Sequence, residues 1–324
     1  MPRKVEISHR TIVFVVLLLA ALWLVFQIRD VIFIIFVAFI IMSALNPLVD
    51  RLQKLRLPRS LSILIVYIIV WGLIGSVLAI IIRPLFDQTT HLLTLLPAAL
   101  GRIELFSNNQ EVITTQFLNR IGTLPADIFK FIVEVFGNLL SVFTTLVISF
   151  YMLLERRNLD EIASSVFGHD NQGKVSKIIT TIETRLGGWV RGEIVLMFSI
   201  GIMTYVGLSL LGVEIALPLA IIAGILEVVP NIGPTISAVP AVLVALTIHP
   251  FTAIATVALY ILIQLLENNL LVPHIMRRAV GVNPLVSILS LMIGLRLAGP
   301  AGAVLAIPLV IVAQTTYNLL TGER

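Results

Sequence analysis

Acidic and amide side chains set inside apolar sequence are the residues that could carry chemistry in this chain. Glu227 stands in the run LPLAIIAGILEVVP, three residues before Pro230. An ionisable side chain at membrane depth is costly, so such a residue by default predicts a function in ion coupling or proton relay. The other interpretation is a buried glutamate that pairs with a basic residue for structural reasons.

Two further polar residues stand where apolar sequence is interrupted. Arg296 is either an ion-pair partner of Glu227, which we favour, or the group that holds an anionic part of a substrate. Asn231 either supplies an amide ligand for a cation or for hydroxyl groups, or serves as an ordinary turn residue. These three residues therefore predict one binding site near the two points where proline and glycine interrupt the apolar sequence.

A second polar group occurs later in the chain. Gln264 and Asn268 share a helical face at i, i+4 spacing, and Glu267 lies beside them. The group predicts either a gate or an inner set of ligands, or else a cap at the membrane boundary. Polar residues at the ends of apolar runs are interpreted first as interfacial anchors: Asn46, Arg191 and Glu193.

Enzymatic chemistry finds little support in the residues. The chain has no cysteine, its five histidines show no metal-ligand spacing, and it has no phosphate-binding glycine loop. We therefore expect no enzyme activity, no metal site and no cofactor, with a proton or sodium as the candidate coupling ion. A net charge of +4 fits a bias of basic loops toward the cytoplasm, and we expect no nucleic-acid partner.

Composition points to the bilayer as the main partner of the chain. The 324 residues are 58% hydrophobic and only 12% charged, with a mean hydropathy of +1.04. Soluble domains carry about 25% charged residues. We predict an all-α integral membrane protein, multi-pass in the cell membrane, with multi-spanning helices and two re-entrant helical hairpins in an inverted repeat.

The hairpins are predicted from breakers inside apolar sequence. In 217–248 the breakers Pro230, Gly233 and Pro234 leave two arms of 13 and 14 residues, each shorter than the about 20 residues of a span. In 284–317 the breakers are Gly299 and Pro300. Dipeptides recur in the same order in the two stretches, which predicts a repeat: Gly212-Val213 with Gly281-Val282, Pro218-Leu219 with Pro284-Leu285, Gly233-Pro234 with Gly299-Pro300, and Val239-Pro240 with Ile307-Pro308.

The rest of the chain divides by polarity. A very short turn at Ile28-Arg29-Asp30 is expected to separate the first two spans. If 217–248 is a hairpin, every basic loop falls on one side, so both termini are placed in the cytoplasm. The expected units are spans 1–3 as a scaffold (1–84), an extracytoplasmic helical region (85–137), span 4 (138–155), a cytoplasmic amphipathic helix (156–193) and a transport unit (194–324).

The order of motifs resembles the autoinducer-2 exporter family of bacterial and archaeal membrane proteins over roughly the last 130 residues. The residues that carry the resemblance are Gly192, Gly212-Val213, Pro218-Leu219, Glu227, Pro230, Gly233-Pro234, Pro240, Gln264, Glu267-Asn268-Asn269, Pro273, Gly281-Val282-Asn283-Pro284-Leu285, Gly294, Gly299, Gly302 and Pro308. The resemblance implies eight-helix-type subunits in a homo-oligomer, with a pentamer as one candidate.

Three functions stay open at this point. The first is a secondary transporter that exports a small polar solute such as autoinducer-2, or that exchanges sodium or lithium for protons. The second is an uncoupled channel or pore. The third is a structural or regulatory membrane protein that binds a partner through its outer region. Substrate, direction and stoichiometry do not follow from the residues.

Overall fold

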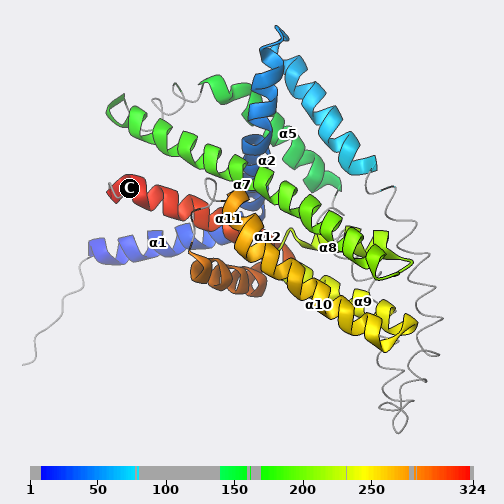
Figure 1. Cartoon of the computed structure of the whole chain (residues 1–324). Helices are drawn as coiled ribbons and strands as arrows, with labels where there is room; N and C mark the ends of the chain where they lie inside the picture. Colours follow the sequence, from blue (N-terminus) through cyan, green and yellow to red (C-terminus); the bar gives the residue numbers. More distant parts are fainter. Residues whose placement is uncertain are drawn as a thin grey trace, which may run out of the picture.

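The computed structural model describes residues 9–76, 79, 139–158, 161, 169–230, 232–276, 281 and 283–321. Within these residues all regular structure is helical, which confirms the all-α part of the predicted fold class (Figure 1). The predicted region 85–137 lies outside the described residues, as do Asn231, Arg277 and Arg278. Six described helices are long and apolar enough to cross a membrane: Arg10–Gln27, Arg29–Gln53, Arg59–Ser76, Gly173–Leu210, Pro250–Met276 and Leu285–Thr321.

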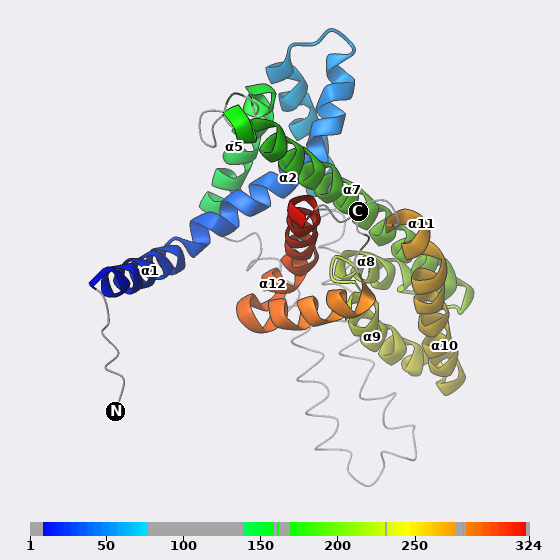
Figure 2. The same cartoon turned by 90° about the vertical axis from the view of Figure 1, so that its left-hand side faces the viewer.

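The chain turns at Ile28, within the predicted turn Ile28-Arg29-Asp30, but it does not fold back there. Helices α1 (His9–Gln27) and α2 (Arg29–Gln53) follow each other directly, and the amide of Ile28 donates to the carbonyl of Leu24 at 3.0 Å. The amide of Ile32 in turn donates to the carbonyl of Ile28 at 3.0 Å, so helical hydrogen bonding continues through the junction. α1 therefore runs on from α2 at an angle instead of folding back beside it (Figure 2).

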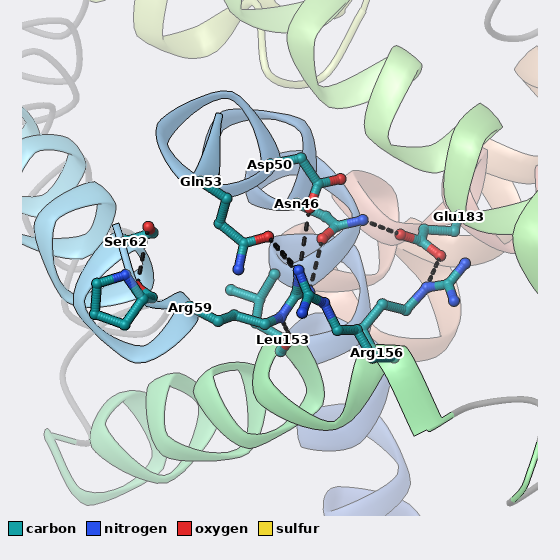
Figure 3. A network of polar contacts seen from close by, with 10 residues as sticks. Asn46, Asp50, Gln53, Arg59, Ser62, Leu153, Arg156 and Glu183 are labelled. Atoms are coloured by element: carbon teal, nitrogen blue, oxygen red, sulfur yellow. Dashed lines mark hydrogen bonds and ion pairs between the residues drawn. The ribbon is translucent and has the colours of Figure 1, made fainter. Parts of the chain in front are cut away.

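A polar network joins four helices (Figure 3). Arg59 donates to the carbonyl of Leu153 at 2.8 Å and to the side chains of Asn46, Gln53 and Asp50 at 3.2 to 3.3 Å. Glu183 accepts from Asn46 Nδ2 at 2.8 Å and from Arg156 Nε. The network thus ties α2, the helix Arg59–Ser76, the end of α5 (Leu139–Glu155) with η2 (Arg156–Asn158), and α7 (His169–Leu210).

α7 is one continuous helix of 42 residues. The sequence predicted a surface helix followed by a separate span, but Gly187 and Gly188 do not interrupt the helix. Gly187 instead lets α2 approach, because a Cβ at Gly187 would lie 2.2 Å from the carbonyl oxygen of Ser43. α7 ends in a Schellman motif, in which Gly212 has a φ of 72° and the amide of Val213 donates to the carbonyl of Leu208 at 3.0 Å.

The next two helices form a hairpin inside the predicted range 217–248. α8 (Ala216–Leu226) and α9 (Ile232–Ile248) pack on each other through one buried core cluster that includes Leu219 and Val244. At the turn, a Cβ at Gly233 would lie 2.0 Å from the carbonyl oxygen of Leu226. Pro234 lies in the first turn of α9, where a helix tolerates proline, so Pro230 and the turn residues before it make the break.

Three elements follow without a gap. α10 (Pro250–Leu266) passes into a π-helical turn, η3 (Glu267–Leu271), and then into α11 (Val272–Met276). The side chain of His249 caps α10 by accepting from the amide of Phe251 at 3.1 Å. Together they form one candidate membrane span, Pro250–Met276, and the sequence did not predict the π turn. Such turns are rare and are frequently found at functional sites.

α12 (Pro284–Thr321) consists of two arms that meet at an angle (Figure 2). The backbone leaves the helical conformation at Ala298 and Gly299, and Gly299 has a φ of 61°. The arms cross at two glycines: a Cβ at Gly302 would lie 2.1 Å from the carbonyl oxygen of Gly294. The break falls where Gly299 and Pro300 predicted it.

The backbone conformation agrees with the predicted repeat at one pair of glycines and differs at another. Gly212 and Gly281, which precede the two hairpins, both have positive φ, 72° and 55°. Gly233 and Gly299, in contrast, are not equivalent, because Gly233 is helical and packed on Leu226 while Gly299 is left-handed with open space around it. The repeat therefore remains a prediction.

Candidate functional site

Three buried glutamates from three different elements form the candidate site. Glu227 and Glu267 are 0% exposed and Glu193 is 4% exposed. The charged neighbours of the Glu227 carboxyl are the carboxyls of Glu267 and Glu193. We call these three side chains the carboxyl site.

An apolar layer next to the carboxyl site shows how the three elements bring it together. Ile200 of α7, Ala223 of α8 and Ile263 of α10 form one core cluster and are at most 1% exposed. Ala223 precedes Glu227 by four residues and Ile263 precedes Glu267 by four residues, so each pair shares a helix face. Because Ile200 follows Glu193 by seven residues, two turns of α7, the glutamates gather on one side of this layer.

Small residues allow the close approach that the site needs. A Cβ at Gly224 would lie 2.7 Å from the carbonyl oxygen of Met197, one turn from Glu193. A Cβ at Gly192 would lie 2.7 Å from the sulfur of Met276 in α11. Helices in membranes commonly meet at such positions, because glycine lets the backbones approach. α8 and α11 are thereby held against the part of α7 that carries Glu193.

Glu267 lies at the junction of α10 with the π turn. It is the first residue of the π turn η3, and its Oε2 accepts from Gln264 Nε2 at 3.0 Å. Its Oε1 is buried without a hydrogen-bond partner among the described residues. The predicted pairing of Gln264 with Glu267 is thus present, whereas Asn268 is exposed.

The carboxyl site has no positive partner in the described part of the chain. Both oxygens of Glu193 and both oxygens of Glu227 are buried and accept no hydrogen bond there. The ion pairs among the described residues lie elsewhere: Arg29–Asp30, Arg59–Asp50 and Arg156–Glu183. The expected pair of Arg296 with Glu227 is wrong for this structure, since Arg296 is exposed at the end of its arm while Glu227 is buried.

The remaining predicted residues are placed as follows. Asn231 lies outside the described residues. Gly233 and Pro234 are buried at the start of α9, and Pro300 begins the second arm of α12. Across the described ranges, no three acidic or histidine side chains are placed to hold a metal ion together.

Sequence reasoning missed Glu193. It was interpreted as an interfacial anchor, because it stands directly before the apolar run that begins at Ile194. The signal that could have found it is Gly192, since a small residue beside an acidic one marks a place where another helix comes close. Glu193 is buried because α8 and α11 lie against this part of α7.

Long apolar helices, a helix broken at glycine and buried acidic groups define a multi-pass membrane protein with a polar site in its interior. The model of the AI-2E family transporter matches residues 12–322, nearly the whole chain. The chain therefore belongs to the AI-2E transporter family, as the resemblance predicted. As a membrane-embedded transporter it contacts lipid, and the apolar side chains of α1, such as Phe14 and Trp23, are exposed.

Curated relatives agree with this assignment. The AI-2 transport protein TqsA of Escherichia coli (strain K12) is 28% identical over 302 residues, which cover 89% of this chain and 85% of TqsA. YueF of Bacillus subtilis (strain 168), named provisionally as a transport protein, is 26% identical over 302 residues, 87% of this chain and 82% of YueF. YhhT of Escherichia coli (strain K12), with the same provisional naming, is 36% identical over 123 residues, 38% of this chain.

Proposed function

We propose that this protein is a secondary transporter whose carboxyl site couples a proton or cation to the movement of substrate. The observation that carries the proposal is the burial of Glu193, Glu227 and Glu267 together, without a basic partner among the described residues. Three such groups contribute nothing that favours folding, because each loses its hydration. Their retention in the interior is explained by a functional use.

The physics of the site favours coupling over a passive path. A carboxylate in a buried site needs a neutralising proton or cation, since an uncompensated buried charge is strongly unfavourable. Three adjacent carboxyls repel one another when ionised, so loading of the site and its charge are linked. The conformational change is therefore disfavoured while the site is empty and charged, and it is favoured once the site is loaded. This dependence on loading is the behaviour of a carrier.

The hairpins are the candidates for the moving part. α8 has 11 residues and α9 has 17, about 16 and 26 Å, so each is shorter than a membrane core of about 30 Å. We propose that both hairpins are re-entrant and that their broken ends form the translocation site, as in other carriers with discontinuous helices. In support, Val229 at the first turn packs against a core cluster that includes Leu291 and Ala303 of α12.

Two substrate classes remain candidates for this chain. The printed name of TqsA assigns AI-2 to that protein, which makes a small polar solute of this kind one candidate here. The other is sodium or lithium exchanged for protons, for which carboxylate oxygens are suitable ligands. We further propose, as the resemblance implies, a homo-oligomer with both termini in the cytoplasm.

The proposal is tested by proton flux into proteoliposomes that contain an internal pH dye. We expect addition of sodium, lithium or AI-2 to trigger flux that saturates with substrate, and labelled substrate to show counterflow. Current far above the turnover of a carrier, without counterflow, would show a pore instead. No flux and no counterflow with any of the three would reject transport of these substrates.

Removing the hydrogen bond from Gln264 to Glu267 is expected to favour proton loading of the site. Gln264→Met keeps the volume of the side chain but removes the donor that lies 3.0 Å from Glu267 Oε2. A hydrogen bond to a charged carboxylate contributes more than one to a neutral carboxyl, by about 1 to 1.5 kcal/mol. Without it the empty site is less stable, so the proton concentration for half-maximal flux should fall about tenfold. The control is Asn268→Leu, an exposed position one residue past Glu267, for which we expect no change.

A further inference from the structure

A second set of buried polar groups lies on the other side of the apolar layer from the carboxyl site. Thr204 of α7 is 0% exposed, Ser237 of α9 is 1% exposed and Tyr260 of α10 is 6% exposed. The Ser237 hydroxyl donates to the carbonyl of Pro234 at 2.9 Å and is a neighbour of the Tyr260 hydroxyl. Thr204 Oγ1 and the Tyr260 hydroxyl have no partner at hydrogen-bonding geometry among the described residues.

Contacts on either side place Thr204 and Tyr260 at the same level of the α7–α10 interface. Toward the carboxyl site, Ile200 packs with Ile263. Away from it, Leu208 shares a core cluster with Tyr260 and with Leu259. Thr204 lies one turn from both Ile200 and Leu208, and Tyr260 lies about one turn before Ile263. Both hydroxyls therefore lie just beyond the apolar layer.

The order along these helices is polar, apolar, polar. Tyr260 precedes Glu267 by seven residues, about 10 Å along the helix, and Ile263 lies between them. Buried polar groups without protein partners are the groups that ordered water satisfies in protein interiors. A thin apolar layer between two wet sites acts as a closed gate, because water does not remain in a narrow apolar constriction.

We propose that Thr204, Ser237 and Tyr260 form a second polar site, which binds water and the transported ion in transit, and which the layer of Ile200, Ala223 and Ile263 separates from the carboxyl site. The part of this proposal that concerns the ion rests on the proposed function. Hydration of the second site does not, and it can be measured in the absence of transport.

Cysteine reactivity measures the hydration, because the natural chain has no cysteine. Thr204→Cys and Ser237→Cys would be compared with Leu208→Cys, which is one turn from Thr204 on the same helix and is buried in the apolar cluster. We expect a small charged methanethiosulfonate to modify the first two in full-length protein in proteoliposomes at least about tenfold faster than the third. Equal rates at all three positions would overturn the second site, and two variants on different helices guard against failure of one to fold.

The gate is tested by proton leak under an imposed pH gradient without substrate. Ile263→Ala removes most of the layer on α10 and should raise the leak several-fold, whereas Leu262→Ala, on the exposed side of the same helix, should not. An unchanged leak in Ile263→Ala would show that the layer is not the barrier. Unreactive cysteines together with intact substrate-triggered flux would reject the second site alone; reactive cysteines without any such flux would reject the transporter proposal alone.

Discussion

Replacement of Glu227 by glutamine is expected to abolish substrate-triggered proton flux while the protein still folds. The amide has the size of the carboxyl but cannot bind or release a proton, and it cannot neutralise a cation. Both oxygens of Glu227 lack a partner at hydrogen-bonding geometry among the described residues, and an amide can still donate to the neighbouring carboxyl of Glu267. It also removes repulsion with Glu267 and Glu193. The measurement is the pH-dye assay with the variant and the wild-type protein reconstituted in parallel.

Two comparisons make this result specific. Glu214→Gln changes an exposed glutamate just before α8, and we expect full flux from it. Glu193→Gln and Glu267→Gln are expected to reduce flux strongly, because each removes one of the neighbours that share the site. Wild-type flux from Glu227→Gln, with an unchanged response to substrate, would contradict a coupling role for this residue.

Substitution of Gly302 by alanine is expected to open the second hairpin. The new Cβ would lie 2.1 Å from the carbonyl oxygen of Gly294 and 2.9 Å from the Cβ of Ala298, so the arms of α12 cannot keep their crossing. Overpacking of this kind costs about 1–3 kcal/mol, occasionally more, because backbone and not a flexible side chain must move. We expect a lower melting temperature in detergent and loss of flux. The same change at Gly294, 2.3 Å from the carbonyl oxygen of Gly302, should have the same effect.

Gly72→Ala is the matched control for the crossing glycines. Gly72 lies in the helix Arg59–Ser76, and a Cβ there would meet nothing within 4 Å. Since alanine favours helix over glycine by about 0.5–1 kcal/mol, the melting temperature should stay the same or rise slightly. If Gly302→Ala were as stable and active as Gly72→Ala, the arms would not cross at these glycines in the working protein.

The hairpin positions followed from local chemistry. Proline and glycine act on their own turn of the backbone, so their effect can be predicted without knowledge of the fold. The breakers Pro230, Gly299 and Pro300 accordingly lie at or beside the observed interruptions. The all-α membrane fold followed in the same way from composition, whereas re-entry into the bilayer, the inverted repeat and the oligomer stay predictions.

The candidate site was only partly predictable, because its members meet through packing between distant segments. Glu227 and Glu267 were identified from their apolar surroundings. Glu193 was not, since its burial depends on α8 and α11 lying against α7 at Gly224 and Gly192. The pair of Arg296 with Glu227 was wrong for a related reason. A residue's position next to a helix interruption does not determine the direction in which its side chain points. The end of α1 at Gln27 agrees with the predicted turn, but the angle between α1 and α2 did not follow from the residues, because helical hydrogen bonds continue through Ile28.

The length of α7 has a mechanical consequence. A helix of 42 residues is about 63 Å long, about twice the thickness of a membrane core, and it behaves as a stiff lever. α7 crosses α2 closely at Gly187 and Ser43, and this crossing is the natural pivot of the helix. Glu183, bonded to Asn46 and Arg156, lies one turn to one side, and Glu193 lies less than two turns to the other. Rotation about this point would displace the two glutamates in opposite directions, so we expect release of the polar network to accompany rearrangement of the carboxyl site.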